Sequence, residues 1–91
     1  MANVLMYCAA ACSFCVQAER LLLARGVAVI EKIRVDLNPE LRVAMMERTG
    51  RRTVPQIYID GRHVGGYQEL ASLDRTGELS LLLNFVKIDD N

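Results

Sequence analysis

Apolar and polar residues alternate along the chain in a pattern that predicts short strands separated by helices. Residues 3–8 are almost entirely apolar, which is typical of a central strand covered on both faces. Over residues 13–25 the apolar positions recur at helical spacing and Gly26 follows, so a helix is expected there. Residues 27–36 are rich in β-branched side chains and predict a second strand.

A second helix is indicated by the residues that would begin it. Asn38 suits the N-cap, Pro39 suits the first helical position, and Glu40 suits the positive end of the helix dipole. The helix should end near Thr49, because Gly50 can adopt the left-handed conformation that closes many helices.

The remaining segments predict a hairpin and two further helices. Residues 56–59 and 62–64 flank Asp60-Gly61, a strong turn signal, so we expect them to pair as antiparallel strands. Helices should follow over residues 67–76 and 78–86. The element order is then β-α-β-α-β-β-α plus a C-terminal helix. This order predicts an α/β fold in which a four-stranded mixed sheet has helices on both faces.

The composition is that of one small domain, residues 1–91, with room for a single site. Lysine plus arginine and aspartate plus glutamate both total 11, so no surplus of positive charge suggests a nucleic-acid partner. Three cysteines are an odd number and are not spread as pairs, which argues against a secreted disulfide framework and for a reducing compartment. A cytoplasmic location is expected.

The first 18 residues carry no charged side chain, so a signal peptide or a membrane span has to be weighed. A signal peptide would begin with a basic region, which is lacking, and polar residues such as Asn3, Ser13 and Gln17 interrupt the apolar run. Glu19 and Arg20 follow directly, which also disfavours a membrane span. We interpret the segment as a strand that leads into a helix, and we expect no membrane partner.

The pair Cys12 and Cys15 lies where the first strand gives way to the first helix. Cys12 would sit at the first helical turn, where unpaired N–H groups and the helix dipole stabilise a thiolate. Cys15 falls on the same helical face, so the two thiols can close a small disulfide. Two cysteines at this spacing beside a βαβ pattern favour a thioredoxin-like redox site. The alternative is a pair of buried structural cysteines, which suits Cys15 better than Cys12.

Two kinds of metal site are alternatives to this interpretation. Cys8, Cys12 and Cys15 resemble the cluster motif of radical S-adenosylmethionine enzymes, but those enzymes need a barrel of roughly 200 residues or more. A structural zinc ion would need four ligands, and the lone His63 lies far away in the hairpin, so we assign it no role. Cys8 ends a strand, where a small buried thiol is expected, although it could pair transiently with Cys12.

Two segments far from the cysteines could build the rest of a site. Val54-Pro55 precedes the third strand and is either a plain strand start or a cis bond that turns the Val54 backbone toward an extended substrate. Arg51 and Arg52 are either a solvated pair or a clamp for a carboxylate. Gly65-Gly66 is either a turn or a close backbone approach to an anionic group at a helix N-terminus.

Taken together, these motifs resemble the small bacterial dithiol glutaredoxins over nearly the whole chain. The resemblance is carried by Tyr7, Cys12-Ser13-Phe14-Cys15, the segment from Thr53 to Asp60, and Gly65-Gly66. It implies the thioredoxin fold, with Cys12 as nucleophile, Cys15 as resolving thiol and Pro55 in cis. It also implies a glutathione-dependent thiol–disulfide oxidoreductase, active as a monomer, that reduces protein–glutathione mixed disulfides with Cys12 and protein disulfides with both thiols.

Glutathione is the cofactor and partner that the resemblance implies. Its cysteine backbone would pair with Val54, its glycine carboxylate would lie near Arg51, and its γ-glutamyl end would rest on the backbone around residues 66–68. The glutathione-binding residues expected on this basis are Tyr7, Ser13, Phe14, Arg51, Thr53, Val54, Pro55, Gly66, Tyr67 and Gln68.

The chain departs from the family pattern at three places. Ser13 and Phe14 stand where the family usually has proline and tyrosine, Ala9 stands where it usually has lysine, and Tyr67 begins a segment that is usually small and acidic. The serine opens an alternative function, because dithiol glutaredoxins with serine there resemble those that hold a [2Fe-2S] cluster. Such a cluster would bridge a homodimer, with Cys12 of each chain and two glutathiones as ligands, and would serve in cluster storage, transfer or redox sensing.

Overall fold

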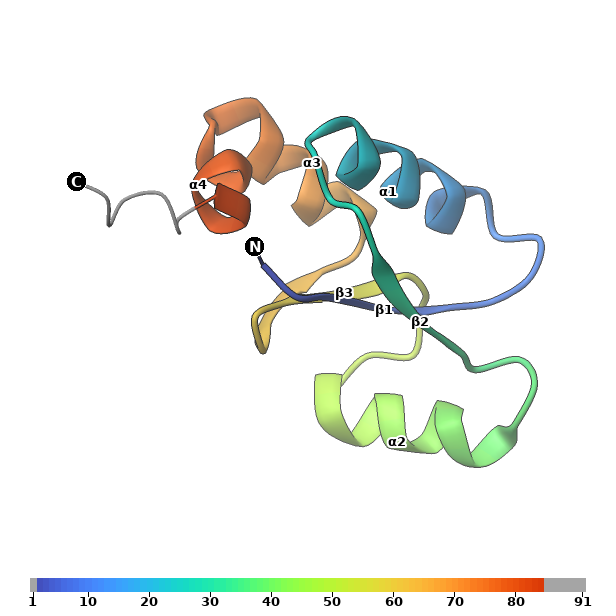
Figure 1. Cartoon of the computed structure of the whole chain (residues 1–91). Coiled ribbons are helices and arrows are strands. Elements are labelled where there is room, and N and C mark those ends of the chain that lie inside the picture. Colours follow the sequence, from blue (N-terminus) through green and yellow to red (C-terminus); the bar gives the residue numbers. More distant parts are fainter. Residues whose placement is uncertain (1, 85–91) are drawn as a thin grey trace.

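The computed structural model describes residues 2–84, which form a four-stranded sheet between helices (Figure 1). The predicted element order is confirmed. In chain order the elements are β1 (Val4–Cys8), α1 (Ser13–Ala24), β2 (Ile30–Arg34), α2 (Pro39–Thr49), β3 (Gln56–Ile59), β4 (Arg62–Gly65), α3 (Tyr67–Thr76) and α4 (Glu78–Asn84). None of the described helices is long and apolar enough to cross a membrane.

The sheet is mixed, with β1 at its centre. The strand order is β2-β1-β3-β4, and β1 is parallel to β2 but antiparallel to β3, which forms a hairpin with β4. Val4 pairs with Ile30 on one side and with Ile59 on the other. β1 therefore has a neighbouring strand at each edge and a hydrophobic core on each face, as its near-continuous apolar pattern predicts.

Two hydrophobic cores lie on opposite faces of the sheet. Helices α1, α3 and α4 cover one face, and α2 covers the other (Figure 1). Alternate residues of β1 point to opposite cores, because successive side chains of a strand alternate in direction. The larger core contains Val4, Met6, Cys8, Cys15, Ala18, Leu22, Ile57, Ile59, Leu70, Leu79 and Leu83. The smaller core beneath α2 contains Tyr7, Val35, Met45 and Tyr58.

The ends of α2 follow the predicted capping signals. Asn38 is the N-cap, and its Oδ1 accepts a hydrogen bond of 2.9 Å from the N–H of Glu40. Gly50 closes the helix with a left-handed φ of 74°. The caps satisfy backbone groups that a helix leaves without partners inside itself.

Several predicted boundaries differ from the structure by one to three residues. The second strand was expected over residues 27–36, but β2 spans only Ile30–Arg34, because the five residues of β1 offer no further partners. Val29, before it, is 76% exposed. The fourth strand extends one residue beyond its predicted end, to Gly65, which pairs with Ile57 beside a bulge. The predicted end of the last helix, Val86, lies outside the described residues.

Candidate functional site

The predicted site segments meet at one end of the sheet. Because β1 and β3 run in opposite directions, the residues after β1 lie beside the residues before β3. Cys12 Sγ is 3.8 Å from the carbonyl oxygen of Val54, and a Cβ on Gly66 would lie 3.3 Å from the carbonyl oxygen of Pro55. The Val54–Pro55 peptide bond is cis, as the resemblance implies.

Cys12 is the N-cap of α1 and is partly exposed. Its backbone is extended, with φ −108° and ψ 107°, and its Sγ accepts a hydrogen bond of 3.3 Å from the N–H of Cys15. The thiol also lies within donating distance of the Val54 carbonyl. Negative charge on this sulfur would therefore meet an N–H donor and the positive end of the α1 dipole.

Cys15 is in a different environment, although it is only one turn of helix away. Its side chain is 5% exposed and belongs to the larger core. Burial, reinforced by a hydrogen bond to Cys12, raises the pKa of the Cys15 thiol to about 12. Burial likewise raises the pKa of Cys8, which is also in this core. Near neutral pH both buried thiols therefore keep their protons.

A carboxylate that the sequence analysis did not identify holds the loop before Cys12. Asp36 Oδ2 accepts a hydrogen bond of 3.3 Å from the N–H of Ala10. The guanidinium of Arg34 donates two hydrogen bonds of 2.7 Å to the same carboxylate and keeps its pKa well below the usual range. Asp36 lies two residues after β2, at the same sheet end as the residues after β1, and no local pattern in the sequence marks it as a partner of that loop.

A buried glutamine and a half-buried histidine support the loop before β3. Gln56 is fully buried, and its amide nitrogen donates a hydrogen bond of 3.0 Å to the carbonyl of Thr53. Its Oε1 is 2.8 Å from His63 Nε2. Burial and the charge of Arg51 lower the pKa of His63, which favours the neutral ring. His63, to which the sequence analysis assigned no role, therefore supports the segment that carries Val54.

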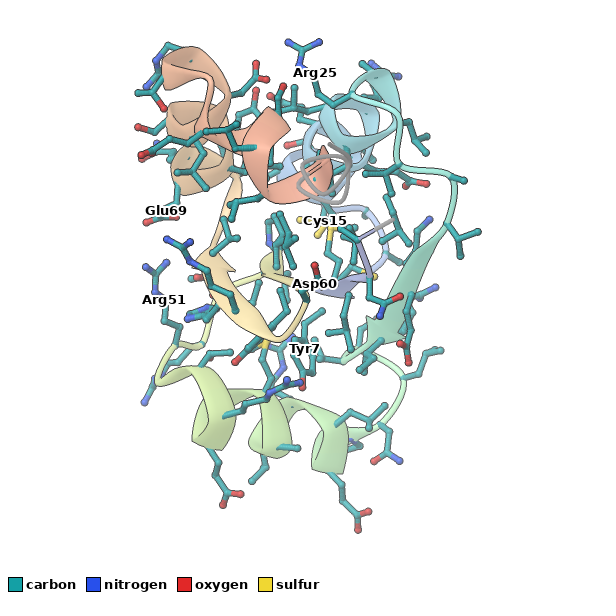
Figure 2. All side chains as sticks on the ribbon, turned by 60° about the vertical axis from the view of Figure 1, so that its left-hand side comes forward. Tyr7, Cys15, Arg25, Arg51, Asp60 and Glu69 are labelled. Carbon is teal, nitrogen blue, oxygen red and sulfur yellow. The ribbon has the colours of Figure 1, made fainter. Side chains whose placement is uncertain are left out.

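Arg51 lies beside the N-terminus of α3. Its Nη2 is 3.2 Å from Oε2 of Glu69, and Oε1 of Glu69 accepts a hydrogen bond of 2.8 Å from the N–H of Gly66. These two contacts, with that to Arg51 the larger, lower the pKa of the Glu69 carboxyl. Figure 2 shows Arg51 and Glu69 on the same side of the molecule. The sequence alone predicts no function for Glu69.

An aromatic pair joins the starts of α1 and α3. The rings of Phe14 and Tyr67 are stacked, with centroids 6.0 Å apart and an interplanar angle of 24°. Phe14 is 50% exposed, whereas Tyr67 is partly buried against the larger core. Ser13 and Gln68, also predicted to be site residues, are exposed next to this pair.

Tyr7 has its contacts on the α2 side of the sheet. Its hydroxyl accepts a hydrogen bond of 3.2 Å from Arg48, and its ring meets Tyr58 edge-on at 6.3 Å. Figure 2 shows Tyr7 on the α2 side of the sheet and Cys15 on the opposite side. Contact between Tyr7 and glutathione stays a prediction.

No set of three His, Cys, Asp or Glu side chains within residues 2–84 is arranged to hold a metal ion. The three cysteines form no disulfide. What the site offers is therefore one accessible thiol with hydrogen-bond partners, a second thiol buried behind it, and backbone groups at Val54 and Gly66 along its rim.

Comparison with known proteins gives consistent matches. The glutaredoxin family model matches residues 4–64. A glutaredoxin of Neisseria meningitidis serogroup A is 46% identical over 84 residues, which cover 92% of this chain and 99% of the relative. Glutaredoxin 3 of Escherichia coli K12 is 43% identical over 83 residues, covering 91% and 99% of the two chains.

Solved structures agree with these sequence matches. The structure of a buckwheat glutaredoxin–glutathione complex has a TM-score of 0.84 and 26% identity, and it covers 92% of this chain and 78% of that one. The solution structure of a glutaredoxin from Brucella melitensis has a TM-score of 0.75 and 43% identity, with coverage of 88% and 87%.

Proposed function

The chain belongs to the glutaredoxin family and has the thioredoxin fold, and from this premise we propose that it is a glutathione-dependent oxidoreductase that reduces protein–glutathione mixed disulfides. Thiol–disulfide oxidoreduction is the general activity of the family. The observation that carries the proposal is the contrast at the start of α1, where Cys12 is accessible and hydrogen-bonded while Cys15 is buried and protonated.

The first half of the proposed cycle uses Cys12 alone. Its thiolate attacks the glutathione sulfur of a mixed disulfide, so the bond between the substrate protein and glutathione breaks and a Cys12–glutathione disulfide forms. The substrate cysteine leaves as a thiolate and takes a proton from solvent. A second glutathione thiolate then attacks the bound glutathione sulfur, which releases glutathione disulfide and restores the Cys12 thiolate.

Protein disulfides would need both thiols. Cys12 attacks the substrate disulfide and becomes joined to one substrate cysteine, after which Cys15 loses its proton and attacks the Cys12 sulfur. The substrate leaves with both cysteines reduced, and a Cys12–Cys15 disulfide remains for two glutathiones to reduce. Burial of Cys15 makes its deprotonation the demanding step.

The rim of the site supports glutathione as the reductant. We place the backbone of its cysteine on Val54, its glycine carboxylate near Arg51 and its γ-glutamyl end on the backbone of Gly66, Tyr67 and Gln68. Ser13, Phe14, Thr53 and Pro55 would line the same surface, and the similar buckwheat structure is a glutathione complex. The other parts of the proposal are glutathionylated or disulfide-bonded proteins as substrates, a monomeric reductase and a cytoplasmic location.

A [2Fe-2S] cluster is the second candidate. Ser13 is exposed beside the partly exposed Cys12, so the side chain that replaces the family's proline leaves the thiol accessible. Cys8 and Cys15 are buried, which leaves Cys12 as the cysteine that each chain would contribute. The remaining ligands would be glutathione thiolates in a homodimer.

The deciding experiment is turnover of a glutathionylated protein by glutathione with NADPH and glutathione reductase. We expect wild-type protein to be active and Cys12→Ser to lose at least about a hundredfold in rate, because serine is not a nucleophile toward disulfides at neutral pH. Full activity of Cys12→Ser would refute the assigned nucleophile. Reduction by thioredoxin reductase in the absence of glutathione would refute the glutathione dependence.

A further inference from the structure

The loop between β1 and α1 consists of three alanines, residues 9–11, and leads directly to Cys12. Their side chains are methyl groups, which neither donate nor accept hydrogen bonds, so they cannot fix the loop themselves. Ala11 nevertheless has a φ of 56°, in the left-handed region that alanine rarely adopts. A backbone in such a conformation needs support from the structure around it.

Asp36, in the segment after β2, provides such support. The N–H of Val35 donates a hydrogen bond of 2.9 Å to the carbonyl of Cys8, where β1 ends. One residue later, Oδ2 of Asp36 accepts the 3.3 Å hydrogen bond from the N–H of Ala10. The two 2.7 Å hydrogen bonds from Arg34 hold the carboxylate in place. The side chain of Asp36 thus continues the contacts between β1 and β2 into the loop.

The same loop is connected to both thiols of the site. Cys12 follows it as the N-cap of α1, with its Sγ 3.3 Å from the nitrogen of Cys15 and 3.8 Å from the carbonyl oxygen of Val54. Burial is the largest cause of the raised pKa of Cys15, and a backbone hydrogen bond from Ala9 to this thiol acts against it. A shift of the loop would therefore change the surroundings of both sulfurs.

We propose that Asp36 is a positioning residue for the thiol chemistry, because its carboxylate holds Ala11 in the left-handed conformation and so keeps the Cys12 sulfur at the N-terminus of α1. This inference rests on the proposed function. Asp36 acts through the loop. Without its carboxylate, Ala11 can relax to a negative φ and carry Cys12 away from the Val54 carbonyl and the N–H of Cys15.

The simpler interpretation is that Asp36 only stabilises the fold through its ion pair with Arg34. The chain offers a matched control, because Arg25 also donates two hydrogen bonds to one carboxylate, that of Asp74, at 2.6 and 2.9 Å. Arg25 is the C-cap of α1 and lies at the opposite end of that helix from Cys12. Asp74→Ala therefore removes a comparable ion pair without disturbing the loop.

The first test measures the rate of alkylation of Cys12 by iodoacetamide at pH 7, followed by mass spectrometry, and it needs no glutathione. We expect Asp36→Ala to lower this rate about three- to tenfold, the scale of one net hydrogen bond. Loss of charge alone would raise it, because a nearby carboxylate disfavours a thiolate. Asp36→Asn keeps an oxygen acceptor for Ala10 and should react at least as fast as the wild type, and Asp74→Ala should match the wild type. An unchanged or higher rate in Asp36→Ala would overturn the inference.

The second test asks whether the effect passes through Ala11. Glycine adopts positive and negative φ about equally readily, so Ala11→Gly removes the tendency to leave the left-handed conformation. For turnover of a glutathionylated peptide, Asp36→Ala should lower kcat/KM about three- to tenfold in the wild-type background but at most about twofold in the Ala11→Gly background. Equal losses in the two backgrounds would contradict the role of the loop.

The two tests also separate this inference from the proposed function. Urea denaturation should show that Asp36→Ala and Asp74→Ala are both folded and similarly destabilised, so a difference between them in alkylation reports on the loop. If the wild type does not turn over the glutathionylated peptide, the proposed function fails. If it does, but Asp36→Ala keeps the wild-type alkylation rate, only the role of Asp36 fails.

Discussion

The N–H of Cys15 donates a hydrogen bond of 3.3 Å to the sulfur of Cys12, while the Cys15 thiol itself is buried in the larger core. One helical turn thus supplies a backbone donor to the accessible sulfur and removes the second sulfur from water. The two thiols differ in their surroundings more than their spacing of three residues suggests, and the proposed function assigns them different steps.

Cys15→Ser should separate the two proposed activities. Deglutathionylation needs only Cys12, so its rate should stay within about threefold of the wild type, whereas reduction of a protein disulfide should fall at least about tenfold. Mass spectrometry should find the variant trapped as a Cys12 mixed disulfide with the protein substrate. Cys8→Ala is the control, because Cys8 is buried in the same core but has no step in the cycle. Equal loss of both activities would contradict the division.

The step that uses Cys15 should depend steeply on pH. A thiol with a pKa of about 12 is protonated throughout the neutral range, and its thiolate fraction rises tenfold for each pH unit below that value. Burial, the largest cause of the raised pKa, persists when Cys12 is in a mixed disulfide. Stopped-flow measurement of Cys12–Cys15 disulfide formation should therefore show the rate increasing about tenfold per unit between pH 6 and 9. A rate independent of pH would contradict the protonated thiol.

The stacked rings of Phe14 and Tyr67 should contribute to stability as a pair. A double-mutant cycle with Phe14→Ala and Tyr67→Ala should give a coupling free energy of unfolding of about 0.5–1.5 kcal/mol, measured by urea denaturation. Val16→Ala removes a similarly exposed apolar side chain from the same helix and should show no coupling to Tyr67→Ala. Coupling below the error of the measurement would mean that the rings are not stacked in solution.

Gly65 should tolerate a side chain less well than Gly77 does. Both residues have positive φ, 116° and 87°, which costs an alanine about 1–2 kcal/mol. Only at Gly65 would the added Cβ also meet a neighbour, Glu69, at 3.0 Å, whereas nothing lies within 4 Å of it at Gly77. Gly65→Ala should therefore lower the free energy of unfolding more than Gly77→Ala, and Glu69→Ala should recover part of the excess.

The cluster alternative makes a spectroscopic prediction. Anaerobic reconstitution with iron, sulfide and glutathione should give a brown dimer with visible charge-transfer absorption if Cys12 is a cluster ligand, and Cys12→Ser should abolish both. Ser13→Pro restores the residue typical of the family and should reduce cluster retention without loss of reductase activity. A colourless monomer would contradict this alternative.

The fold could be predicted from the sequence because each element carries a local signal. Such signals act between residues that are close in the sequence. Examples are the apolar run of β1, the Asn38 cap of α2 and the turn at Asp60. The end of β2 carries no such signal. Val35 is apolar and β-branched, as Ile33 two residues earlier is, yet it is buried in a turn, and β2 ends because β1 ends.

The chemistry of the site was predictable where it depends on spacing, as for Cys12 and Cys15. It was not predictable where it depends on tertiary pairing. In the sequence, Asp36 is an ordinary polar residue near the end of a strand. Its hydrogen bond with the N–H of Ala10 exists only in the folded protein. The position of Glu69 at the start of a helix indicates a helix cap. Its contact with Arg51, eighteen residues earlier, forms only when the loop before β3 packs beside α3.

The central position of β1 has a consequence for the chain during its synthesis. The ribosome makes this strand first, but its antiparallel partner β3 ends at Ile59, and at ~5–20 residues per second several seconds pass before that partner exists. Until then Cys15 has no core to be buried in, and Cys12 has no Val54 carbonyl beside it. In the nascent chain only the first turn of α1 can distinguish the two thiols, and their difference in burial arises when the sheet is complete.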